Sequence, residues 1–100
     1  MVEPGLEIPR KDIADFCRQH RIKRLAVFGS AVRKDFRYTS DVDLLVEFEP
    51  DAQVGFIALS RLQRELSAIF GRQVDLVPRN GLKPKIRDAV LSSAEELYAA

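Results

Sequence analysis

Two aspartates that alternate along one apolar segment are the residues of this sequence best suited to chemistry. Asp41 and Asp43 lie at the start of the predicted strand Val42–Phe48. Side chains two residues apart in a strand point to the same side, so both carboxylates would share one face. Two negative charges held this close are unfavourable unless a cation lies between them. Mg²⁺ is the natural candidate, because it binds one or two carboxylates together with substrate phosphates.

A Gly-Ser pair precedes these aspartates. Gly29 and Ser30 directly follow the apolar segment Lys23–Phe28. Glycine lets the backbone come close to a phosphate, and Ser30 could cap a short helix over residues 31–33. Free N–H groups at the start of a helix attract anions. An ordinary strand-to-helix turn would use the same two residues, and the two interpretations are compatible. Together with the aspartates, the pair indicates metal-assisted chemistry on a nucleoside triphosphate.

A third carboxylate lies inside another apolar segment. Asp75 is in the middle of the predicted strand Gln73–Val77, where burial without partners would be costly. The alternative is an edge strand with Asp75 facing water. It is disfavoured because Asp41 and Asp43 give a reason for a carboxylate on an adjacent strand. Three carboxylates on one sheet face could hold two Mg²⁺ ions about 3.5–4 Å apart, one activating the attacking oxygen and one holding the triphosphate.

The elements that position these residues follow from the spacing of apolar side chains. Helices are predicted over residues 9–20 and 54–70, with a further helix starting at Pro84. Ile86, Val90 and Leu91 are expected on the inner side of that last helix. Gly71 is placed to end the preceding helix, and residues 92–100 could be helix or strand. Alternating helices and strands predict an α/β or α+β fold, a short sheet packed by about four helices.

Composition narrows the class of protein. A chain of 100 residues fits one domain, residues 1–100. The net charge of +1 gives no basic field, so direct nucleic-acid binding is not expected. Cys17 is the only cysteine, which excludes an internal disulfide. Neither a secretory signal nor an apolar run of membrane-spanning length is found, so no membrane association and a cytoplasmic location are expected.

Gly29-Ser30, the Asp-Val-Asp at 41–43 and Asp75 together resemble the minimal nucleotidyltransferase (MNT) family of the DNA polymerase β-like superfamily. The resemblance covers nearly the whole chain and implies a mixed sheet flanked by helices. It places Gly29 and Ser30 on the triphosphate. It makes the three aspartates the catalytic residues and the metal ligands for Mg²⁺. Lys34 stands where family members often have glycine, a departure that removes no ligand.

The chemistry is then transfer of a nucleoside monophosphate to an acceptor hydroxyl, with positioning and charge stabilisation as the main contributions. Asp75 could take the acceptor proton. The resemblance implies an antitoxin of a HEPN/MNT toxin–antitoxin pair, which uses ATP to adenylylate a tyrosine of a HEPN-domain ribonuclease. Two alternatives stay open. One is the catalytic subunit of a two-part enzyme that nucleotidylates a small molecule such as an antibiotic. The other is a non-catalytic antitoxin that masks its partner by binding.

Overall fold

A mixed four-stranded sheet organises the chain. The computed structural model describes residues 8–29 and 41–100. Within them the strands are β1 (Ile22–Phe28), β2 (Val42–Phe48), β3 (Val74–Pro78) and β4 (Glu95–Ala99), in the spatial order β3-β2-β1-β4. β1 pairs antiparallel with β2 and β4, whereas β2 pairs parallel with β3. The sheet is therefore mixed, as the family resemblance implies. The undecided segment 92–100 first completes a helix that ends at Ser93 and then forms β4.

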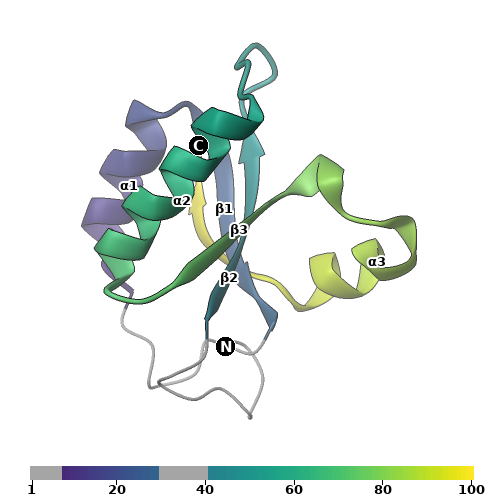
Figure 1. Cartoon of the computed structure of the whole chain (residues 1–100). Helices are drawn as coiled ribbons and strands as arrows, with labels where there is room; N and C mark the ends of the chain where they lie inside the picture. Colours follow the sequence, from purple (N-terminus) through teal and green to yellow (C-terminus); the bar gives the residue numbers. More distant parts are fainter. Residues whose placement is uncertain (1–7, 30–40) are drawn as a thin grey trace.

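Three α-helices accompany the sheet in the part of the chain that the structure describes: α1 (Arg10–Gln19), α2 (Phe56–Phe70) and α3 (Pro84–Ser93). α1 and α2 lie together on one side of the sheet, and α3 stands apart from them (Figure 1). α2 is the crossover that two parallel neighbouring strands require. None of these helices is long and apolar enough to cross a membrane. The short helix expected over residues 31–33 lies outside the described residues.

The core fills the space between the sheet and the first two helices. Alternate residues of the strands point into it, and each helix adds its apolar stripe. The core residues with no exposed surface are Ile13, Cys17, Leu25, Val27, Val42, Leu44, Leu66 and Val74. Burial raises the pKa of the Cys17 thiol to about 12, so this side chain is a neutral packing group. The two helices predicted over residues 9–20 and 54–70 are thus confirmed, and their apolar sides face the core.

The end of α2 follows the sequence signal. Gly71 adopts a left-handed conformation with φ of 69°, and its N–H donates to the Ser67 carbonyl. Glycine adopts this conformation without the steric penalty of a side chain. Ser67 also accepts, through its hydroxyl oxygen, a hydrogen bond of 3.0 Å from the N–H of Val74. The turn is therefore tied directly to the start of β3, which fixes where that strand begins.

α3 departs from its prediction. The expected inner side with Ile86, Val90 and Leu91 is not buried: Ile86 is 50% exposed, and Val90 and Leu91 are only partly covered. The helical spacing correctly indicated a helix from Pro84. It gave no information about whether another element would cover the apolar side. α3 instead belongs to the connection that carries the chain from β3, at one edge of the sheet, to β4 at the other.

A pair of truncations tests this division between core and surface. Leu66→Ala removes a fully buried side chain and should lower the free energy of unfolding by about 2–5 kcal/mol. Ile86→Ala should change it by less than about 0.5 kcal/mol, because that side chain is half exposed. Urea unfolding followed by circular dichroism measures both. Equal losses for the two variants would place Ile86 in the core after all.

Candidate active site

The site begins with the pairing of β2 and β3. Their register places Asp43 directly beside Asp75. Neighbouring strands lie about 4.8 Å apart, and residues paired in register project from the same face. Asp43 is partly buried, whereas Asp75 is exposed. Two carboxylates that are 32 residues apart in the sequence are thus adjacent, as the sequence predicts.

The expectation for the surroundings of Asp75 was wrong. β3 is an edge strand and Asp75 faces solvent, which is the arrangement that the sequence interpretation disfavoured. The carboxylate therefore carries no burial cost that a metal would have to offset. An edge position and a place beside Asp43 are compatible, because β2 covers only one side of β3. Asp75 is consequently accessible to molecules that approach from outside the sheet.

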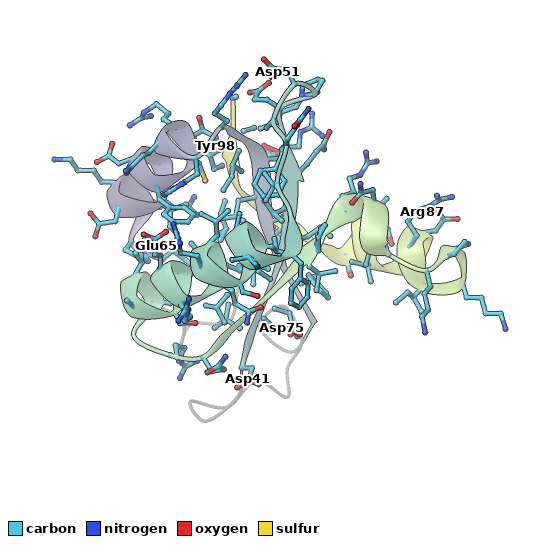
Figure 2. All side chains as sticks on the ribbon, turned by 45° about the horizontal axis from the view of Figure 1, so that its top comes forward. Asp41, Asp51, Glu65, Asp75, Arg87 and Tyr98 are labelled. Carbon is cyan, nitrogen blue, oxygen red and sulfur yellow. The ribbon has the colours of Figure 1, made fainter. Side chains whose placement is uncertain are left out.

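Asp41 lies immediately before β2 and is exposed. The N–H of Val42 donates to the Gln73 carbonyl at 2.9 Å, which fastens this end of β2 to the start of β3. Figure 2 shows Asp41 and Asp75 at the same end of the molecule, far from Asp51. Across residues 8–29 and 41–100, however, no three acidic, histidine or cysteine side chains gather tightly enough to form a finished metal site.

Gly29 brings the turn after β1 against the same carboxylate. Phe28 pairs with Asp43 across the β1–β2 ladder, and Gly29 follows with φ of 71°. A Cβ atom at Gly29 would lie 3.2 Å from Asp43 Cγ and would collide with Oδ2. Only glycine therefore allows this turn and Asp43 to approach so closely. Ser30, the predicted phosphate contact, lies outside the described residues.

This donor set fits a divalent cation. Carboxylate oxygens are the ligands that Mg²⁺ prefers, and it keeps several positions for water and substrate phosphates. Asp43 and Asp75 are paired neighbours on an accessible face, and Asp41 lies free to solvent at the same end. The exposed side chains of Asp41 and Asp75 are not held by packing and can adopt other staggered rotamers. The roles of the three aspartates as ligands stay predictions.

Two hollows flank the middle and far end of β2. The larger, of about 560 Å³, is lined by residues such as Phe48, Pro78 and Arg79, at the end of β2 away from Asp43. The smaller, of about 240 Å³, includes Ala26 and Leu45 and lies on the face that carries Asp43. Proximity to the carboxylates makes the smaller hollow the more relevant to chemistry. In the sequence, the one indication of this hollow is Leu45, an apolar residue that shares its strand face with acidic residues.

Comparison with known proteins identifies the family. The nucleotidyltransferase domain family matches residues 10–97. The chain belongs to this family. A Methanocaldococcus jannaschii protein named "Putative protein adenylyltransferase" is 36% identical over 91% of the chain and 95% of its own length. The protein adenylyltransferase MntA of Thermococcus cleftensis is 39% identical over 70% of the chain and 69% of its own length.

A solved structure agrees in fold. It contains a tri-AMPylated Shewanella oneidensis HEPN toxin in complex with an MNT antitoxin. The match has a TM-score of 0.67 and 19% identity, and it covers 91% of this chain and 70% of that chain. The chain therefore shares the fold of that antitoxin. The family match over residues 10–97 and the relatives named adenylyltransferases show that the chain is a nucleotidyltransferase. The family match and these relatives confirm the family and the enzyme class that the sequence predicted.

Two glycines with nearly the same backbone provide a test of the close approach at Gly29. Gly29→Ala and Gly71→Ala both place a side chain at φ near 70°, which costs about 1–2 kcal/mol. At Gly71 an added Cβ meets nothing within 4 Å, whereas at Gly29 it meets Asp43. Gly29→Ala should therefore be the more destabilised in thermal unfolding and should lose Mg·ATP binding, whereas Gly71→Ala should keep it. Equal behaviour of the two variants would exclude the contact with Asp43.

Charge repulsion within the aspartate pair gives a second prediction. Asp43→Asn removes one of two adjacent negative charges, so Tm without metal should equal or exceed the wild-type value. At about 100 times its Kd, Mg·ATP should stabilise the wild type by about 2.7 kcal/mol, and Asp43→Asn should lose this gain. Differential scanning fluorimetry measures both effects. Asp51→Asn, at the other end of β2, is the matched control and should keep the gain. Unfolding of metal-free Asp43→Asn would instead make the residue structural.

Proposed function

We propose that this chain is a protein adenylyltransferase that acts as an antitoxin. It transfers AMP from ATP to a tyrosine hydroxyl of a HEPN-family ribonuclease and thereby silences that enzyme. The observation that carries the proposal is the register of Asp43 beside Asp75 on an accessible sheet face. The names of the relatives support the adenylyl donor and the protein acceptor. The AMPylated toxin in the structural neighbour supports the class of partner.

The two carboxylates differ in a way that suits two tasks. Asp43 lies partly buried against the turn at Gly29, so its position is fixed by the fold. Asp75 is exposed on an edge strand and can meet an incoming acceptor. Asp43 is therefore the better placed ligand. Asp75 is the better placed base for the acceptor proton, since a general base must come within hydrogen-bond reach of that proton.

In the reaction, the tyrosine oxygen attacks the α-phosphorus of ATP and forms the new P–O bond. The bond from that phosphorus to the oxygen bridging to the β-phosphorus breaks, and pyrophosphate leaves with its electron pair. The phenol proton passes to the Asp75 carboxylate and then to water. Two Mg²⁺ ions would be held by Asp41, Asp43 and Asp75. They would neutralise the phosphate charge and ease deprotonation of the acceptor. The chain itself contributes placement of the reacting groups.

The open surface favours a macromolecular acceptor. α1 and α2 cover the opposite side of the sheet, and α3 stands away from the core with no buried residue (Figure 1). Within the described residues, no element encloses the aspartates. A small acceptor would find few groups to surround it there. A protein acceptor brings its own surface and excludes water as it docks, which strengthens the electrostatic interactions in the site.

Intact-mass spectrometry tests the proposal directly. The chain is incubated with ATP, Mg²⁺ and a HEPN-family ribonuclease from the same genome. The expected result is addition of AMP to a tyrosine of that ribonuclease and loss of its activity. The double variant Asp41→Asn with Asp43→Asn should remain folded and add no AMP. Asp51→Asn controls for the loss of a carboxylate elsewhere and should transfer at the wild-type rate.

Two outcomes would contradict the proposal. If the double variant neutralises the ribonuclease as well as wild type does, protection comes from binding alone. If no protein is modified and an aminoglycoside gains AMP instead, the chain is the catalytic subunit of a small-molecule nucleotidyltransferase.

A further inference from the structure

We propose that the hollow between α3 and the exposed sheet face receives the aromatic ring of the acceptor tyrosine. This inference rests on the proposed function and assigns an acceptor site to it. The hollow has a volume of about 240 Å³ and is formed by the two central strands, β4 and the end of α3.

Register places this hollow next to the carboxylates. Phe28, Asp43 and Asp75 form one row across the sheet, and Ala26, Leu45 and Val77 form the row two residues along. Two residues of strand span about 6.6 Å, comparable to the length of a phenol ring with its hydroxyl. A ring seated over Ala26 and Leu45 can therefore extend its oxygen to the row of Asp43 and Asp75, where the proposed transfer takes place.

The lining of the hollow suits a phenol. Its apolar part consists of Ala26, Leu45, Leu91 and Ala94, and its charged rim consists of Arg24, Glu47, Arg79 and Glu96. Leu45 is only 6% exposed yet lies outside the main core cluster, so it forms an apolar floor on the second face of the sheet. The strands below it use their backbone polar groups in the sheet ladders. The floor thus offers an apolar ring contact area without hydrogen-bonding groups.

The same features disfavour the adenine of ATP as occupant. Adenine carries polar nitrogens around its edge, and those that face the apolar part of the hollow would lose their hydrogen bonds to water, which costs free energy. A phenol is apolar except at its hydroxyl, which would point out of the hollow toward the aspartates. The volume also lies below the roughly 300–1,000 Å³ typical of small-molecule sites. One ring carried by a docking protein fits better than a whole nucleoside.

The charged rim of the hollow contains two positive and two negative side chains, and it would surround the tyrosine ring. Glu47 lies 3.9 Å from both Lys23 and Arg79, so its charge is already shared between two cations. Arg24 and Glu96 add one charge of each sign. A neutral aromatic side chain can enter such a rim without leaving a charge unpaired. Selection of the acceptor then depends on the ring itself and on the shape of the partner.

Two variants block the hollow without touching an aspartate. Ala26→Leu fills its floor, and Leu91→Lys places a charge in its wall on a helix that has no buried residue. Ala68→Leu, on the exposed side of α2, is the matched control. Both hollow variants should lose at least about tenfold in kcat/KM for the HEPN ribonuclease, the effect expected when an anchoring aromatic group is lost. Stabilisation by Mg·ATP should stay at the wild-type level in all three.

A soluble probe separates this inference from the proposed function. N-acetyl-L-tyrosinamide should give intermolecular NOEs from its ring protons to methyl groups of Leu45 and Leu91, and Ala26→Leu should abolish them. NOEs from the adenine of AMP-PNP with Mg²⁺ to the same methyl groups would assign the hollow to the nucleotide and overturn the inference. Wild-type kcat/KM in both hollow variants would also overturn it while the proposed function stands. If the wild type modifies no tyrosine, the proposed function fails, and the NOEs alone decide the occupant.

Discussion

The parallel pairing of β2 with β3 is the constraint on which the candidate site depends. A parallel pair needs a connection long enough to return to the start of the sheet, and α2 supplies it. The same helix buries Leu62 and Leu66 in the core, so the packing that forms the core also holds the connection between the two strands in place. A shift of β3 by one residue would turn Asp75 to the opposite face. The register of Asp43 with Asp75 is therefore maintained by burial of the intervening helix.

Close approach of the backbone is the second requirement. Gly29 ends β1 in a left-handed turn, and the space that a side chain would need is filled by the Asp43 carboxylate. Because Phe28 is the ladder partner of Asp43, the antiparallel pairing of β1 with β2 sets this approach. One aspartate thus takes part in two pairings, antiparallel on one side and parallel on the other. That position makes Asp43 the most constrained member of the predicted ligand set.

Local periodicity made most of the fold predictable. Alternation along Val42–Phe48 located β2 to the residue, and the apolar stripe before Gly71 located α2 within two residues. Position within the sheet is a property of the whole fold, so the sequence did not show that β3 lies at the edge or that Asp75 faces solvent. For the same reason the spacing in α3 predicted an apolar side but not what would cover it. The structure confirms that Asp43 and Asp75 are neighbours, whereas the predicted convergence of all three carboxylates on a metal stays a prediction.

One face of the sheet contributes to the hydrophobic core, and the other carries the residues suited to chemistry. One face carries Val42, Leu44 and Val46 into the core under α1 and α2. The other presents Asp43, Leu45 and Glu47, an alternation of charge and apolar surface that contributes little to the main core. Substitutions on the second face can therefore alter what the protein binds without removing core packing. Because α1 and α2 supply the helical side of the core, the second sheet face need not be covered for the core to form. Because α3 has no buried residue, the core does not require it, and its surface can vary without loss of core packing.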